Sequence, residues 1–168
     1  MFNALFSAKG RMRRRDWWLL SFGVMIAYLI SEFLAHQFFG TSSFVEDAAF
    51  KGFPTNGFQY WLLFVNTVGQ WPGICLIAKR WHDRNRPGWL AAIGPIISVP
   101  QVALLHFSDF GGAIPQFAIG AAQAIIGCLG LAFGLWVLID CGILDGTQGQ
   151  NRYGPSPKGV GAQPEDVF

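Results

Sequence analysis

The sequence predicts an all-α membrane protein with four transmembrane helices and both termini in the cytoplasm. Three observations lead to this prediction. Hydrophobic residues make up 52% of the 168-residue chain and charged residues only 13%, whereas a soluble domain typically carries about 25% charged residues. Long apolar runs alternate with short polar segments. Nearly all basic residues fall in segments that four spans place on one side of a membrane.

The predicted spans are apolar runs close to the roughly 20 residues that a helix needs to cross the hydrocarbon. They cover residues 17–39, 60–78, 89–107 and 114–139. The first span follows basic residues, as a secretory signal peptide does, but it is longer than the about 7–15 apolar residues of such a signal. It is therefore expected to remain in the mature protein. Pro95 and Pro100 are expected to kink the third span.

The whole chain, residues 1–168, is predicted to form one transmembrane domain. Its polar parts are a basic N-terminal arm (1–16), a hairpin between the second and third spans (79–88) and a C-terminal tail (140–168). The segments 40–59 and 108–113 are expected to connect the spans on the opposite side. The tail is rich in Gly and Pro, which favours turns over a long helix.

The distribution of basic residues sets the predicted orientation. The arm, the hairpin and the tail together carry eleven of the twelve Lys and Arg residues, and only Lys51 lies in a segment on the other side. Short loops on the cytoplasmic side of a membrane carry an excess of Lys and Arg. The asymmetry therefore predicts a cytoplasmic arm, hairpin and tail. An odd number of spans would separate the two termini, and no further apolar run is present for a fifth span.

Two pairs of polar or ionisable side chains inside the predicted spans share the spacing of a helical turn. Glu32 and His36 are four residues apart near the end of the first span, and Asn66 and Gln70 are four apart in the second, so each pair shares one helical face. Intramembrane ionisable residues can mark a transport path. The simpler interpretation is that Glu32 and His36 reach the interface and that Asn66 and Gln70 form hydrogen bonds between helices.

The fourth predicted span is rich in glycine along one side. Small residues allow membrane helices to approach one another closely. This pattern predicts a helix-packing surface, either within the chain or in a homo-oligomer, formed by Gly120, Gly127, Gly130 and Gly134.

Three separated motifs fall on the predicted cytoplasmic side. They read GRMRRRDWW (10–18), RWHDRNRPGW (80–89) and GTQGQNRYGP (146–155). In this order and spacing the chain resembles the DUF805 family, whose pattern is similar to G-R-x-x-R-x-[DE]-[YFW]-W, R-R-x-H-D-x-x-x-x-G-W and G-x-x-G-x-N-[RK]-[YF]-G-x-P. The resemblance covers essentially the whole chain. It implies a small multi-pass protein of the bacterial inner membrane, and it implies no established activity.

The hairpin pair His82 and Asp83 invites a chemical interpretation. A catalytic zinc site usually needs three protein ligands, and no other histidine lies on the predicted cytoplasmic side. No serine or cysteine occurs in the context of an activated nucleophile, and no paired cysteine spacing suggests a disulfide or a metal site. The sequence therefore predicts no enzyme activity, no cofactor, no metal and no nucleic-acid partner.

Two interpretations of the cytoplasmic motifs remain. In the first, they form a structural cap in which Asp83 pairs with Arg11, Arg15 or Arg152, His82 binds a backbone carbonyl of the tail, and Asn151 ties the tail turn. In the second, an arginine cluster binds an anionic ligand such as a phospholipid head group, because guanidinium groups recognise phosphate in a bidentate manner. The candidate residues for that site are Arg11, Arg15, Arg80, Arg86 and Arg152.

The predicted function is a non-enzymatic membrane role, such as interaction, lipid association or envelope support. The alternative is a small transporter or channel subunit. In that case Glu32, Asn66 and Gln70 are expected to point towards one another within the bundle.

Overall fold

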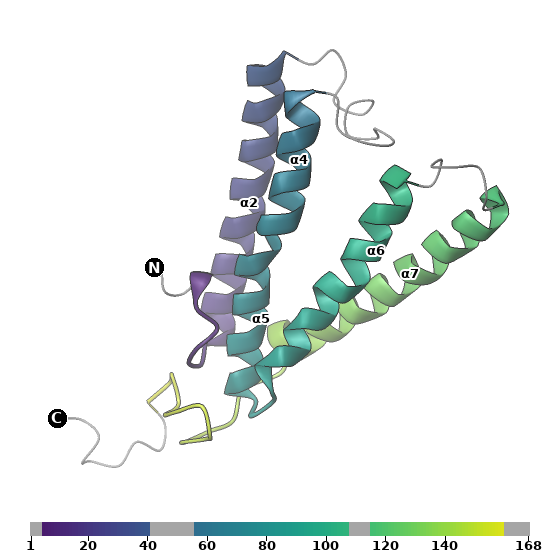
Figure 1. The fold of residues 1–168 in the computed structure, drawn as a ribbon. Helices are drawn as coiled ribbons and strands as arrows, with labels where there is room; N and C mark the ends of the chain where they lie inside the picture. Colours follow the sequence, from purple (N-terminus) through teal and green to yellow (C-terminus); the bar gives the residue numbers. More distant parts are fainter. Residues whose placement is uncertain (1–4, 41–55, 108–114, 160–168) are drawn as a thin grey trace. The chain divides into compact units, whose positions relative to one another are not determined.

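The computed structural model describes residues 5–40, 56–107 and 115–159. The part of segment 40–59 that holds Lys51, the whole of segment 108–113 and the end of the tail at 160–168 lie outside these ranges. Figure 1 shows the helices. In chain order the elements are α2 (Arg14–Phe39), α4 (Gly57–Val68), α5 (Gln70–Asp83), the 3-10 helix η1 (Gly88–Ala92), α6 (Ile93–Phe107), α7 (Gln116–Val137) and the π-helical η2 (Leu138–Ile143).

Within the described parts of the chain, three helical segments are long and apolar enough to cross a membrane. They are Arg14–Phe39, Gly57–Asp83 (formed by α4 and α5 together) and Phe117–Ile143. Their apolar windows are only 6%, 22% and 17% buried within the chain. Most of their apolar side chains therefore face outward, and exposed apolar surface of this extent is typical of contact with lipid. The third predicted span, 89–107, corresponds to a shorter apolar helix, Gly88–Leu104.

The structure moves two predicted boundaries. Residues 79–83 form the last turn of α5, so the predicted hairpin is reduced to Arg84–Pro87. The fourth helix continues through η2 to Ile143, whereas the sequence placed its end at residue 139. In both places the prediction ended a helix at charged residues. The helices continue because those charges are paired inside the fold, as described below.

Two features of the sequence explain the helix starts and the tolerated prolines. The side chain of Asn56 accepts a hydrogen bond from the Gln59 backbone N–H at 2.9 Å and so caps the start of α4. Pro95 lies in the first turn of α6, where a backbone N–H has no partner within the helix. Pro100 lies in the helix interior, where it removes one backbone hydrogen bond.

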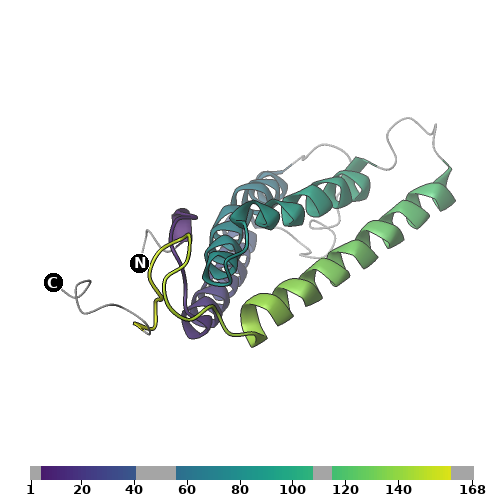
Figure 2. The same ribbon diagram turned by 90° about the horizontal axis from the view of Figure 1, so that it is seen from below.

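The contacts of the chain fall into two compact units. The first contains Met1–Met25, Trp71–Ile93 and Gly134–Phe168, and it therefore holds all three motifs. Within this unit the N-terminal arm and the C-terminal segment lie beside the end of α5 (Figures 1 and 2). Its buried apolar side chains include Met12, Trp17, Leu76, Trp81 and Cys141.

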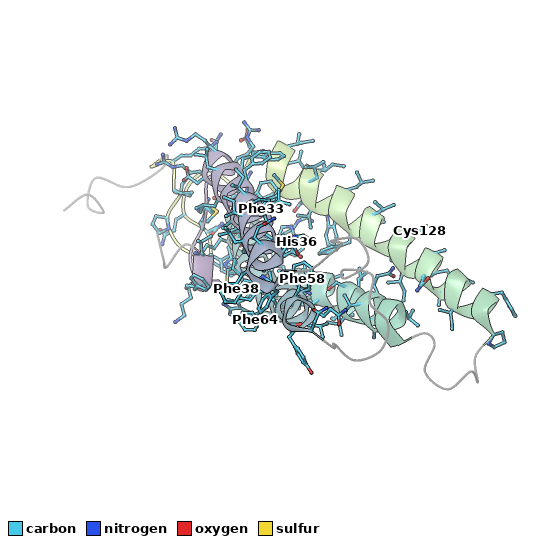
Figure 3. All side chains as sticks on the ribbon, turned by 90° about the horizontal axis from the view of Figure 1, so that it is seen from above. Phe33, His36, Phe38, Phe58, Phe64 and Cys128 are labelled. Atoms are coloured by element: carbon cyan, nitrogen blue, oxygen red, sulfur yellow. The ribbon has the colours of Figure 1, made fainter. Side chains whose placement is uncertain are left out.

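The second unit contains Ile26–Gln70 and Gly94–Phe133. Its small core is formed by Ala35 of α2 with Phe58 and Leu62 of α4, against which Trp61 packs. His36 lies edge-on to Phe58, with ring centroids 5.7 Å apart, and Figure 3 shows the two side chains next to one another. The polar His36 ring is thus part of the α2–α4 contact.

Candidate functional site

The candidate site is the polar cap, which we define as residues 10–15, 80–86 and 140–154. These segments come from the three motifs and the end of the fourth helix. All of them lie in the first unit, where they contact one another.

The end of α5 places the central residues of the polar cap. Asn85 has a positive φ of 58°, and the Asn85 and Arg86 backbone N–H groups donate to the carbonyls of His82 (3.0 Å) and Trp81 (2.8 Å). This pattern is a Schellman motif with asparagine in the left-handed position. It ends the helix and fixes the directions in which Arg84 and Arg86 leave the chain.

Asp83 is the centre of a buried ion triad. Its side chain is 4% exposed and contacts Arg11, at 2.9 Å through Oδ1, and Arg80, at 2.5 Å through Oδ2. The two arginine side chains are 2% and 1% exposed. Since an unpaired buried charge is strongly unfavourable, each guanidinium depends on this carboxylate. The predicted pairing of Asp83 with Arg11 is found, whereas the second partner, Arg80, was not among the predicted ones.

Arg11 also binds the C-terminal segment. Its Nη1 atom donates to the carbonyls of Gly149 (2.7 Å) and Gly154 (3.1 Å), and its Nη2 atom donates to the carbonyl of Thr147 (2.6 Å). With Nε bonded to Asp83 at 2.9 Å, every nitrogen of the guanidinium has a protein acceptor. Arg11 therefore joins the first motif to both of the others.

Arg80 connects α5 to the end of the fourth helix. Its Nε atom donates to the Cys141 carbonyl at 2.7 Å, and its Nη2 atom donates to the Leu144 carbonyl. These are among the carbonyls that a helix end leaves without intrahelical partners. Arg80 thus stabilises the end of the chain's last helix while it pairs with Asp83.

The C-terminal segment approaches Asp83 closely at Gly146. A Cβ atom at this position would overlap the carboxylate of Asp83, so only glycine fits. The next residue, Thr147, donates its backbone N–H and its hydroxyl to the Asp83 carbonyl, both at 2.8 Å. The tail therefore packs against the backbone and the side chain of the same residue.

His82 and Asn151 form a second connection among the motifs. The His82 Nδ1 atom is 3.1 Å from the Gly10 carbonyl, so the predicted contact with a tail carbonyl is wrong, and the acceptor belongs to the N-terminal arm. The tail packs on His82 in two other ways. Asn151 donates to the His82 carbonyl at 2.9 Å, and the Tyr153 ring stacks on the imidazole at 3.8 Å. Asn151 also accepts the Tyr153 backbone N–H and so ties the tail turn, as predicted.

A second buried acid, Asp140, lies in η2. Its side chain is 3% exposed, and its Oδ1 atom pairs with Nη1 of both Arg84 and Arg86, the latter at 3.4 Å. Asp140 and Arg84 are not among the site residues that the sequence predicts. An acid at the end of an otherwise apolar run was the available signal, because such a residue needs a buried partner.

The remaining basic residues of the first unit lie mainly at its surface. Arg15 is 78% exposed and pairs with Asp16, and Arg152 donates to the Asn85 carbonyl while lying over the Tyr153 ring. Arg14 and Lys158 both pair with Asp145. The hydrogen bond from Lys158, followed by the charge of Arg14, lowers the pKa of the exposed Asp145 carboxyl below its usual value.

The five arginines predicted to hold an anion differ in burial. Arg11 and Arg80 are buried and bonded to the protein, while Arg15, Arg86 and Arg152 are at least partly exposed. Within the described ranges, no group of three or more His, Cys, Asp and Glu side chains is arranged to hold a metal ion.

The predicted intramembrane polar residues lie in the second unit. The Tyr28 hydroxyl donates to Asn66 Oδ1 at 3.2 Å and also interacts with Glu32, so it connects these two residues. Gln70, the first residue of α5, donates to the Asn66 carbonyl of α4, and its Oε1 atom accepts from Ser98 of α6 at 3.0 Å. The polar groups therefore bond α2 to α4 and α5 to α6.

The glycine surface of the fourth helix makes little contact within the chain. A Cβ atom at Gly120, Gly127 or Gly134 would meet no described atom within 4 Å, and one at Gly130 would lie 3.7 Å from Ile97. The homo-oligomer through this surface stays a prediction.

Comparison with known proteins identifies the family to which the three motifs belong. Residues 5–155 match the model of the family described as "Protein of unknown function (DUF805)". The chain belongs to the DUF805 family. It is also 30% identical over 160 residues to the "Uncharacterized protein YiiR" of Escherichia coli strain K12 and to that of Escherichia coli O157:H7. Each match covers 93% of this chain and 89% of the relative. No solved structure matches the chain. The match to the DUF805 family includes all residues of the polar cap.

Proposed function

We propose that this DUF805 protein is a multi-pass protein of the bacterial inner membrane with four spans, cytoplasmic termini and a non-enzymatic role in lipid association. The observation that carries the proposal is the buried triad of Arg11, Asp83 and Arg80. The triad joins the first two motifs, and Arg11 also binds the third. Asp83, which the sequence suggested as a possible chemical group, is bonded within the fold. The surface that remains is basic, which suits the anionic head groups of the cytoplasmic leaflet.

The charge of this surface supports the assignment. The exposed cations of the first unit, among its described residues, are Lys9, Arg13, Arg14, Arg15, Arg152 and Lys158, against the exposed acid Asp145 and the half-buried Asp16. The proposed topology puts these cations on the cytoplasmic side, where they would face the phosphates of the inner leaflet. Each contributes about 1 kcal/mol of attraction near an anionic surface.

The lipid preference can be measured with the purified protein in bilayers. Quenching of tryptophan fluorescence by brominated lipids is expected to show a preference for phosphatidylglycerol over phosphatidylcholine that decreases with salt. Lys9→Gln combined with Arg15→Gln should weaken this preference by about 2 kcal/mol, because two surface charges are lost.

Lys51→Gln is the matched control, since the predicted topology places this residue across the membrane. It is expected to leave the cytoplasmic-side preference unchanged. Equal affinity of the native protein for both lipids would contradict the proposal.

The orientation is tested with reporters. A fluorescent protein fused after Gly159 should be active, because it stays in the cytoplasm, and alkaline phosphatase inserted between residues 41 and 55 should be active outside it. The opposite pattern, or activity of the same reporter at both sites, would contradict four spans with cytoplasmic termini.

The alternative is a small transporter or channel subunit. The contact of Tyr28 with both Glu32 and Asn66 favours it, because these groups connect two helices at membrane depth. The same contacts also suit helix packing. Ion flux across proteoliposomes that is lost in Glu32→Gln would favour transport over lipid association.

A further inference from the structure

We propose that Arg84 and Arg86, held together by the buried carboxylate of Asp140, form a binding site for the phosphate group of an anionic phospholipid. We call these three residues the arginine clamp. The proposal rests on the proposed lipid association and names the side chains that bind one head group tightly, in addition to the general attraction of the basic surface.

The geometry of the arginine clamp brings two guanidinium groups to one point. Arg84 Nη1 donates to the carboxylate and, at 3.2 Å, to the backbone carbonyl of Asp140. Arg86 Nη1 lies 3.4 Å from the same Oδ1 atom. Two guanidinium groups that contact one oxygen atom have neighbouring N–H groups, and this arrangement suits the bidentate recognition of a phosphate.

Arg84 and Arg86 have N–H donors without a described protein acceptor, whereas all guanidinium nitrogens of the buried Arg11 have one. Arg11 bonds protein acceptors through all of its nitrogens. By contrast, Nε and Nη2 of Arg84 bond no described residue, and Arg86 forms its ion pair with Asp140 alone among the described residues. Their side chains are 19% and 39% exposed, so both arginines lie partly at the surface.

The charge balance of the arginine clamp also favours an anion. Two guanidinium groups share one carboxylate, which leaves a surplus positive charge. The Oδ2 atom of Asp140 is buried and has no hydrogen-bond partner among the described residues, so Asp140 faces the protein interior. The carboxylate holds the like charges together, and the surplus charge is available to a ligand.

The position of the arginine clamp points to a lipid as the source of the phosphate. Arg84 and Arg86 lie in the short connection between the apolar segment ending at Asp83 and the one beginning at Gly88. Trp89, which is 70% exposed, follows directly, and exposed tryptophan is typical of the membrane interface. The Schellman motif at Asn85 fixes this connection before any ligand binds.

Native mass spectrometry of the full chain in detergent tests the proposal, with phosphatidylglycerol and phosphatidylcholine as probes. The native protein is expected to retain one phosphatidylglycerol molecule. Arg86→Gln should weaken this binding by about tenfold or more, because a charge-assisted contact is lost. Arg86→Lys keeps the charge without the planar fork and should bind with intermediate affinity. Unchanged thermal unfolding of both variants shows that the fold is retained.

The surface variant with Lys9→Gln and Arg15→Gln separates the possible outcomes. The proposal is supported when this variant keeps the tightly bound lipid and Arg86→Gln loses it. It is overturned when Arg86→Gln keeps the lipid. If Arg86→Gln keeps the lipid but the surface variant loses its general preference for anionic bilayers, only the arginine clamp is overturned and the proposed function stands. If the surface variant also keeps that preference, the arginine clamp and the proposed function both fail. Binding of inorganic phosphate that Arg86→Gln abolishes, with unchanged lipid retention, would overturn the lipid as the ligand.

Discussion

Asp83→Asn is expected to lower the free energy of unfolding by about 3–5 kcal/mol, the cost of removing one partner from a buried ion pair. Asp83 is 4% exposed and pairs with both Arg11 and Arg80, which are themselves almost fully buried. An asparagine keeps the shape of the side chain and one acceptor oxygen, but it leaves two guanidinium charges without a counter-ion. Unfolding of the purified protein by SDS titration in mixed micelles measures the loss.

Asp145→Asn is a matched control for this substitution. Asp145 also has two basic partners, Arg14 at 3.7 Å and Lys158 at 3.3 Å, but its side chain is 63% exposed. Exposed ion pairs contribute little to stability because water and salt screen them. The Asp145 variant should therefore unfold like the native protein. Equal losses in the two variants would mean that burial of the triad does not determine its contribution.

Arg11→Lys is expected to cost about 2–4 kcal/mol although it preserves the charge. A lysine ammonium can keep the ion pair with Asp83, but it cannot reach the carbonyls of Thr147, Gly149 and Gly154 at the same time. These carbonyls are partly buried or exposed, so each lost hydrogen bond costs less than the about 1–3 kcal/mol of a fully buried acceptor, and the three losses add up. The C-terminal segment should consequently detach more often and become sensitive to limited proteolysis between residues 146 and 155.

Arg13→Lys provides the comparison for Arg11→Lys. Arg13 is exposed, and its side chain bonds only the Pro157 carbonyl, at 2.5 Å, among the described residues. Its replacement should change neither the unfolding curve nor the rate of proteolysis. If Arg11→Lys also left both unchanged, the hydrogen bonds of Arg11 to the tail would not hold the polar cap together.

Hydropathy and charge predicted the membrane helices because both depend on local composition. The apolar runs at 17–39 and 114–139 correspond to two of the three long helices. The ends of these helices are harder to predict, because a charged residue in a local pattern indicates the end of a span. Residues 79–83 and Asp140 are helical because their charges meet partners that are distant in sequence. Pairing at such separations is not visible in a local pattern.

The composition of the polar cap was only partly predictable. The occurrence of three polar motifs on one side suggested that they meet, and the contact of Asp83 with Arg11 agrees with that suggestion. The sequence did not indicate which arginines would be buried in the polar cap and which would be exposed. Whether an arginine is buried or exposed depends on which carbonyls the tail presents, and those depend on backbone conformations such as the φ of 119° at Gly154.

The missed residues share one property. Arg84, Asp140 and Thr147 act through partners in other segments, and each lay in a stretch that was assigned to a turn or a tail. Gly146 was noted as part of a motif, but the close approach of its backbone to Asp83 required the structure.

Hydrogen exchange of the native protein and of Asp83→Asn in lipid nanodiscs tests the central claim that the three motifs form one interlocked cap. Asp83 lies on α5, but its carboxylate and carbonyl hold Arg11 of the arm and Thr147 of the tail. The substitution is therefore predicted to reduce the protection of backbone amides in both the arm (10–13) and the tail (146–154) to a similar extent, while the amides of 20–35 stay protected. Loss of protection in only one of the two segments, or in neither, would contradict the account.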